Sequence, residues 1–165
     1  MANKVYVVGE AAVLFGSEAG DDVAWTTESI ATANGVQSAR YDRGVLSTAK
    51  AGRYHYRFHA QFQATPGIGT ACRLYAKTSD GTHADNDDGT TDTAVTAITK
   101  LDNLKLVDVM IVDEAAANVE FCVSGTLWLF DRYVQFAFWN ATGATTTADE
   151  TETKLILTPV PDEIQ

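Results

Sequence analysis

The sequence predicts an all-β protein, an antiparallel β-sandwich of jelly-roll type with about eight to ten strands. Three observations support this fold class. One segment of eleven residues alternates strictly between apolar and polar side chains, short β-prone segments recur with turn signals between them, and no long amphipathic helix is present. An immunoglobulin-like sandwich is the alternative, because about seven strands in 100 residues suffice for it. The length of 165 residues suits a single domain over residues 1–165.

The clearest strand is predicted at residues 53–63, where apolar and polar side chains occupy alternate positions. One face carries Tyr54, Tyr56, Phe58, Ala60 and Phe62, and the other carries Arg53, His55, Arg57, His59, Gln61 and Gln63. Because only one face is apolar, the sequence favours an antiparallel sheet whose other face meets solvent or a partner.

The remaining elements are shorter and are separated by turn signals, most of which contain glycine. Strands are predicted at residues 4–8, 11–15, 36–41, 70–77, 93–99, 104–112, 118–123, 126–130, 133–139 and 153–158. Turns are predicted at Pro66-Gly67, Asp80-Gly81, Asp88-Gly89, Ser124-Gly125 and Thr142-Gly143. Asp21 and Asp22 are candidate caps for a short helix within residues 17–34, and residues 115–117 are a candidate helical turn.

Two loops stand out by composition, the acidic loop 79–92 and the Ala/Thr-rich loop 140–152, and both are expected to be mobile. The C-terminal tail is expected to be extended, because Pro159 and Pro161 disfavour a helix. The start of the chain lacks the pattern of a secretory signal. No segment reaches the roughly 18 apolar residues of a membrane span.

The charge is strongly negative and unevenly distributed. The formal net charge of −10 argues against nucleic acid and anionic membranes as partners. Residues 40–77 nevertheless contain seven basic residues and a single acidic one. This split predicts either a dipolar surface that orients the molecule against a neighbour or internal ion pairs between the basic segment and acidic strands.

Searches for catalytic and metal-binding patterns find none that fits. His55 and His59 share a strand face, but four residues along a strand span about 13 Å, too far for one metal ion. The acidic loop 79–92 is rich in oxygen ligands, yet its spacing departs from the calcium-loop pattern. No nucleophile elbow or phosphate-binding loop is present. We therefore expect a protein without enzymatic activity, metal or cofactor.

The cysteines and tryptophans leave alternatives open. Cys72 and Cys122 both lie in apolar segments. They are expected to be either two buried thiols or one disulfide. The tryptophans are candidates for a sugar-stacking platform, but Trp128 and Trp139 fall in predicted core strands, which favours packing over binding.

One part of the sequence resembles a known class of proteins. Residues 107–121, followed by Arg132-Tyr133-Val134 and by residues 154–165, are similar to small virion proteins of tailed bacteriophages, in particular capsid decoration or cement proteins. The resemblance implies a β-rich protomer, often trimeric, that binds the major capsid protein on the capsid exterior after synthesis in the host cytoplasm. A tail or head-completion protein and a carbohydrate-binding β-sandwich module are the alternatives.

The polar face of the predicted strand 53–63 lies at the centre of the basic segment, so it is the candidate interface with an acidic neighbour. The candidate interface residues are Arg53, His55, Arg57, His59, Arg40 and Arg43. The candidate contacts of the C-terminal tail are Pro159, Pro161 and Ile164.

Overall fold

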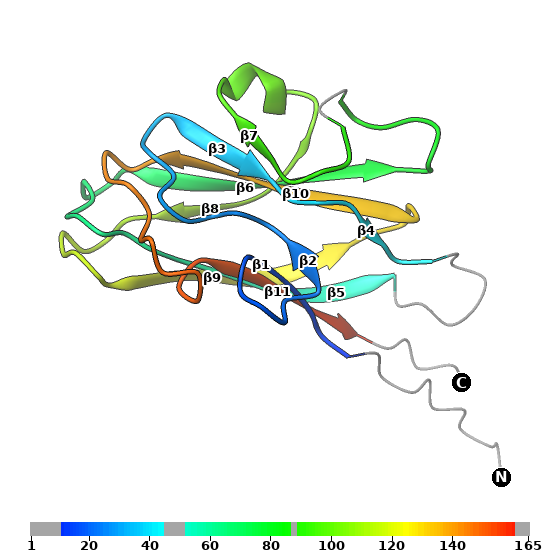
Figure 1. Cartoon of the computed structure of the whole chain (residues 1–165), viewed down its shortest axis with the longest axis horizontal. Coiled ribbons are helices and arrows are strands. Elements are labelled where there is room, and N and C mark those ends of the chain that lie inside the picture. Colours follow the sequence, from blue (N-terminus) through cyan, green and yellow to red (C-terminus); the bar gives the residue numbers. More distant parts are fainter. Residues whose placement is uncertain (1–10, 45–51, 87–88, 161–165) are drawn as a thin grey trace, which may run out of the picture.

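The computed structural model describes residues 11–44, 52–86 and 89–160, which form two facing β-sheets (Figure 1). The elements are β1 (Val13–Gly16), β2 (Val23–Ala24), β3 (Asn34–Gln37), β4 (Tyr41–Asp42), β5 (Arg53–Gln61), β6 (Ala71–Ser79), β7 (Thr93–Val95), the 3-10 helix η1 (Ile98–Leu101), β8 (Lys105–Ile111), β9 (Glu120–Trp128), β10 (Tyr133–Ala141) and β11 (Lys154–Val160). The predicted strand 4–8 and the tail residues Pro161 and Ile164 lie outside the described residues. No helix among the described residues is long and apolar enough to cross a membrane.

The order of the strands is that of a jelly roll. One sheet has the order β2-β1-β11-β5-β9, and the other has the order β7-β3-β10-β6-β8, with β4 also pairing with β10. Among the eight strands of four or more residues in the described part of the chain, the first, eighth, third and sixth form one sheet, and the second, seventh, fourth and fifth form the other. This order is the double Greek key of a jelly roll. The predicted fold class is confirmed, and the immunoglobulin-like alternative is wrong.

The core lies between the sheets and is built from alternate residues of facing strands. The apolar face of β5 points inward as predicted, with Tyr54, Phe58 and Ala60 buried, while β10 contributes Phe136 and Phe138 from the opposite sheet. The rings of Phe58 and Phe138 meet across the interface with centroids 5.5 Å apart. Burying an aromatic side chain of this kind stabilises the fold by about 1.5–3 kcal/mol.

The outer faces of the two sheets are not equivalent. Behind the six-stranded sheet, Ala137 and Trp139 of β10 are buried by β7 and η1 in a second apolar cluster. The members of this cluster are Val95, Leu101, Leu104, Ala137 and Trp139. Among the described residues no such layer covers the five-stranded sheet, whose outer face carries exposed side chains of β5 and β9. Among the described residues, the five-stranded sheet therefore has an outer face without a second layer, whereas the six-stranded sheet is covered in part and leaves Leu106 and Ile111 of β8 exposed.

Strand β9 corrects a predicted turn. Residues 118–123 and 126–130 were expected to be separate strands joined at Ser124-Gly125, but β9 runs without interruption from Glu120 to Trp128. Gly125 faces the ring of Tyr56, and a Cβ atom at position 125 would lie 2.7 Å from the Tyr56 hydroxyl. The glycine therefore makes room for an aromatic ring from the neighbouring strand, and it does not form a turn.

Neither predicted helical segment is a helix. Residues 115–117 have no helical turn. In the connection between β1 and β2, Asp22 accepts the backbone N–H of Leu14 at 2.9 Å, and Asp21 accepts that of Glu18 at 3.0 Å. These carboxylates bind loop and strand backbone and cap no helix. Likewise β7 ends at Val95, and η1 follows where residues 93–99 were expected to remain extended.

Pro159 is extended as expected, but it lies within a strand. It is buried in β11 and pairs with Tyr54 of β5. Strand β11 pairs with β1 only over residues 155–157, so a proline at position 159 removes no hydrogen bond from that ladder. The residue is therefore part of the sheet and cannot serve as a tail contact.

Candidate interface on the outer face of the five-stranded sheet

The open face is centred on β5, with β9 on one side and β11 on the other. Across the sheet, Arg53 lies opposite Trp128, His55 opposite Thr126, and Arg57 opposite Ser124. On the β11 side the partners of the same three residues are Val160, Thr158 and Ile156. Arg53, His55, Arg57 and His59 therefore lie in one row along the middle of this face, as the alternation predicted.

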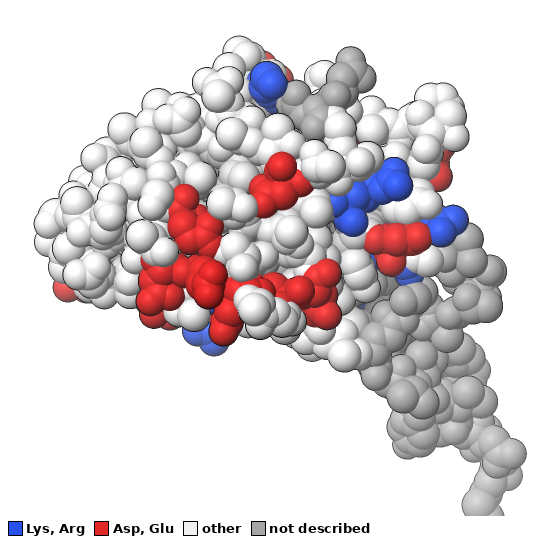
Figure 2. Space-filling model, viewed as in Figure 1, with Lys and Arg blue, Asp and Glu red and all other residues white. Residues whose placement is uncertain are grey.

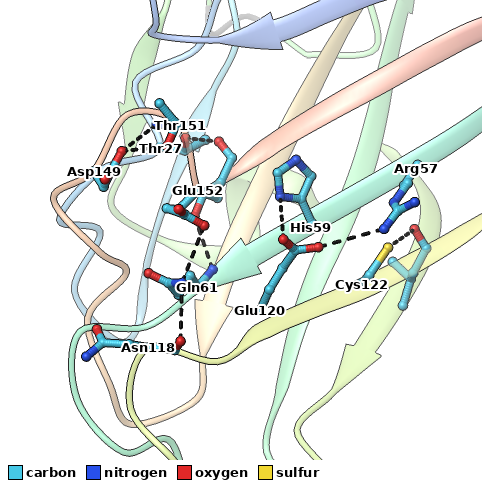
Figure 3. Close-up of polar contacts among 12 residues, drawn as sticks. Thr27, Arg57, His59, Gln61, Asn118, Glu120, Cys122, Asp149, Thr151 and Glu152 are labelled. Atoms are coloured by element: carbon cyan, nitrogen blue, oxygen red, sulfur yellow. Dashed lines mark hydrogen bonds and ion pairs between the residues drawn. The ribbon is translucent and has the colours of Figure 1, made fainter.

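The charge of this row is partly compensated inside the molecule. Figure 3 shows Arg57 and His59 of β5 directed toward Glu120 of β9. The guanidinium of Arg57 lies 3.8 Å from the Glu120 carboxylate, and the His59 ring Nδ1 lies 3.9 Å from it. The exposed pair of Arg57 and Glu120 contributes little, about 0–1 kcal/mol. Of the two arrangements that the charge distribution predicted, this face therefore shows both: an internal ion pair and basic side chains at the surface.

The ring of His59 takes up a proton less readily than an ordinary histidine. Burial lowers the pKa of its ring from the ordinary 6.5, with the nearby Arg57 and Lys154 acting in the same direction, and the opposing carboxylate of Glu120 does not compensate. The buried Nδ1 has no hydrogen-bond partner, since 3.9 Å to Glu120 exceeds hydrogen-bonding distance. The guanidinium groups of Arg53 and Arg57 supply positive charge in this row.

One end of the face is aromatic, which the sequence did not predict. Trp128 is 47% exposed and Phe130 is 66% exposed, and their rings stack with centroids 6.0 Å apart. The guanidinium of Arg53 lies 5.7 Å from the centre of the Trp128 ring. The expected core position of Trp128 is wrong, whereas Trp25 and Trp139 are buried. Exposed aromatic rings beside an arginine are typical of protein interfaces.

The opposite end of the row is fixed by the loops around it. Gln61 donates its side-chain N–H to the Asn118 carbonyl at 3.3 Å and to the Glu152 carboxylate at 3.4 Å (Figure 3). In loop 140–152, the hydroxyl groups of Thr142 and Thr146 are buried and hydrogen-bonded. The exposed residues of this loop include 148–151, and its predicted mobility stays a prediction.

Two of the candidate interface residues do not belong to this face. Arg43 is buried at 1% exposure, and its guanidinium donates to the Tyr54 hydroxyl and the Asp131 carbonyl. Its predicted role at the surface is wrong, because the side chain fills the end of the sandwich. Arg40 is exposed but lies over the ring of Tyr133 in the other sheet, 4.1 Å from its centre.

Elsewhere the structure shows both grouped charges and ion pairs between opposite charges. Figure 2 shows acidic side chains gathered over the side where β1 and β2 lie, and basic side chains near β4. On the acidic side, Lys154 pairs with Glu18. Near β4, Arg132 holds Asp42 through two hydrogen bonds of 2.8 and 2.7 Å, which lower the pKa of Asp42 to about 2.

The carboxylates of loop 79–92 are engaged in turns. Asp85 accepts the backbone N–H of Thr78 at 2.6 Å, and Asp80 accepts those of Thr82 and His83 at 2.7 Å. These hydrogen bonds, first that from the His83 backbone, lower the pKa of Asp80 to about 2. Within the described ranges, no three metal-ligating side chains converge. Residues 87–88 of this loop lie outside the described part of the chain.

The two cysteines are not paired. Cys72 is buried on the inner face of β6, and Cys122 is exposed on the outer face of β9. Burial raises the pKa of the Cys72 thiol, so this thiol remains protonated and unreactive. The disulfide alternative is wrong, and Cys122 belongs to the open face.

No protein-family model and no curated protein sequence matches this chain. A function is therefore inferred from the geometry of the open face and from the sequence resemblance.

Proposed function

We propose that this protein is a structural virion component, a capsid decoration or cement protein that binds the major capsid protein on the capsid exterior. It acts as a homo-oligomer, a trimer by the resemblance, without enzymatic activity, cofactor, nucleic acid or membrane. The observation that supports this proposal best is the asymmetry of the sandwich. One sheet is covered in part by β7 and η1, whereas no described segment covers the outer face of the other, which carries Arg53, Arg57 and Trp128.

The size of the face suits a protein partner. Strands β1 and β11 have four and seven residues, and β5 and β9 have nine each. At about 3.3 Å per residue and a spacing of about 4.8 Å, these four strands give a surface of roughly 450 Å². This area is little more than half of the roughly 800 Å² that each partner buries in a standard interface. Loops next to the face, or a second copy, would supply the remainder.

The composition of the face also suits a protein partner. Arginine and tryptophan are enriched at the centres of interfaces, where lysine is depleted. On this face the arginines of β5 are Arg57, which is exposed, and Arg53, which is half-buried, and Lys154 is 8% exposed and held by Glu18. A jelly roll is found in capsid and lectin domains alike, so the fold supports this class of function without selecting it.

The experiment is cosedimentation of the purified protein with capsid shells, prepared without it, of the virus that encodes it. The double variant Arg53→Glu and Arg57→Glu reverses both charges on the open face and should lose binding while its melting temperature stays close to that of the wild type. Lys100→Glu with Lys105→Glu is the matched control, since both lysines are exposed on the six-stranded-sheet side. Equal binding by both double variants would refute the proposed face.

Another position in the virion, in the tail or in the head-completion complex, would use the same face. Fractionation of disassembled virions separates these locations, because a decoration protein accompanies the capsid shell in many copies.

A carbohydrate-binding module is the second candidate, and one observation favours it. Trp128 and Phe130 are exposed beside the polar side chains of Thr126 and His55, a combination suited to stacking and hydrogen bonding with a sugar. A glycan array distinguishes the two functions. Binding of a glycan that is lost in Trp128→Ala, together with no capsid binding, would favour the carbohydrate function.

A further inference from the structure

The described sheets have four edges, and three of them are protected against pairing with another chain. Strands β2 and β7 have only two and three residues. Strand β8 carries Lys105 and Asp108 and is irregular where it passes Leu74 and Tyr75 of β6. Short length, charge and bulges are the usual means by which sheet edges avoid pairing.

The fourth edge, β9, has none of these protections. It is nine residues long, contains no proline or lysine, and pairs with β5 in unbroken register. Its only charged residue is Glu120, at the first position. In the described part of the chain no strand pairs with its other side. An edge of this length and composition is a template for strand addition.

The backbone groups on the free side of β9 can be assigned from one hydrogen bond. Leu129 donates its N–H to the Gly52 carbonyl at 2.9 Å, in the register that places Trp128 opposite Arg53. In an antiparallel ladder, alternate residues direct both backbone groups to the same neighbour. The odd-numbered residues of β9 therefore face β5. The residues that direct N–H and C=O to the free side are Glu120, Cys122, Ser124, Thr126 and Trp128.

We propose that β9 strands of two copies pair antiparallel around a two-fold axis at Ser124 and join the two five-stranded sheets into one continuous sheet. In this register Ser124 lies opposite the partner's Ser124, and Cys122 opposite the partner's Thr126. All five free-side residues of each strand are then paired, which forms about ten backbone hydrogen bonds.

The register is complementary in charge and in shape. Glu120 lies opposite the partner's Trp128, and the partner's Arg53 is the next residue across the sheet. The acidic end of each strand thus meets the basic, aromatic end of the other, and no like charges stand opposite each other. On the inner face, Phe121 lies opposite the partner's Leu127, so apolar residues meet on the core side.

The pairing doubles the open face, because the outer surfaces of both sheets become continuous. It uses a second copy of this chain as partner and does not depend on capsid binding. The contact is two-fold and therefore separate from any trimer contact.

A thiol crosslinking experiment on the full chain tests the pairing. Ser124→Cys in a Cys122→Ser background places two thiols on opposite residues, whose Cα atoms are about 5.5 Å apart in a hydrogen-bonded pair. Thr158→Cys in the same background is the control, since Thr158 is exposed on the same face but lies in β11, between β1 and β5. A short bis-maleimide reagent is added, and mass is read on a denaturing gel.

The expected result is that most of the Ser124→Cys protein doubles in mass and that the Thr158→Cys protein does not. Thr126→Cys with native Cys122 should also crosslink, because these two positions face each other. Sedimentation of the uncrosslinked wild type should show a dimer or a multiple of it. A monomeric mass without crosslinking at positions 124 and 126, whether the edge is empty or covered by its own chain, overturns the proposal.

Discussion

Gly125→Ala is expected to destabilise the protein, because the added methyl group would occupy the space that the ring of Tyr56 fills. The added Cβ would lie 2.7 Å from the Tyr56 hydroxyl oxygen, 2.9 Å from Cζ and 3.0 Å from Cε1. The ring cannot move away freely, because its hydroxyl donates a 2.7 Å hydrogen bond to Asp108 of β8. This contact joins the two sheets, and it contributes, with burial, to a Tyr56 pKa raised to about 12.

The magnitude follows from these two constraints. Overpacking of a well-filled site costs about 1–3 kcal/mol, and weakening a hydrogen bond to a carboxylate costs up to about 1.5–3 kcal/mol. We expect a loss of about 2–3 kcal/mol in the free energy of unfolding, which lowers the melting temperature by about 5–10 °C for a chain of this size. Urea unfolding and differential scanning calorimetry measure both quantities.

Gly52→Ala is the matched control, because a Cβ at position 52 meets nothing within 4 Å. That variant should be as stable as the wild type or slightly more stable. Tyr56→Phe removes the nearest atom, so its combination with Gly125→Ala should cost less than the sum of the two single variants. If Gly125→Ala has wild-type stability, Tyr56 does not lie against β9, and the continuous strand with its free edge is wrong.

Three further predictions concern buried and paired charges. Because the pKa of His59 is lowered below 6.5, the unfolded chain binds more protons below that pH, so stability should fall as pH drops from 7 to 5.5. His59→Gln should reduce this loss in urea unfolding, and an unchanged pH profile would contradict it. Asp42 has a pKa of about 2 in place of 3.8, so its stabilisation is present above pH 4 and lost as pH falls toward 2. In Asp42→Asn the melting temperature should therefore fall less between pH 4 and pH 2 than in the wild type. An equal fall in the variant and the wild type would count against the ion pair of Asp42 and Arg132. Arg43→Met should cost about 2–3 kcal/mol by urea unfolding, because the buried Tyr54 hydroxyl and the Asp131 carbonyl lose a charged donor. An unchanged free energy of unfolding in Arg43→Met would indicate that Arg43 lies at the surface.

The alternation of residues 53–63 predicted β5 and the direction of its side chains, because period two follows directly from strand geometry. The same rule applied to one continuous strand would have predicted an outward-facing Trp128, because Trp128 alternates in step with Glu120, Cys122, Ser124 and Thr126. The turn predicted at Gly125 divided the segment into two strands, so the alternation was not followed from one to the other. Sequence alone does not show that a glycine faces a ring of a neighbouring strand.

Arg43 was misplaced for a different reason. A count of charges treats every arginine in residues 40–77 as surface charge. The buried guanidinium of Arg43 is hydrogen-bonded to Tyr54 and Asp131, two residues that lie far from each other in the sequence. Pro159 shows the same limit. Its residue type favours an extended tail, and only the register with β5 shows that it belongs to a strand.

The central claim, that the outer face of the five-stranded sheet binds the partner, is tested most directly by capsid binding of Trp128→Ala against Leu106→Ala. The two side chains are exposed to the same degree, 47% and 48%, and Leu106 lies in β8 of the other sheet. Cosedimentation should show that Trp128→Ala weakens capsid binding by about thirtyfold, the loss of an interface residue worth about 2 kcal/mol, while Leu106→Ala binds like the wild type. Wild-type affinity for Trp128→Ala, or an equal loss in both variants, would contradict the claim.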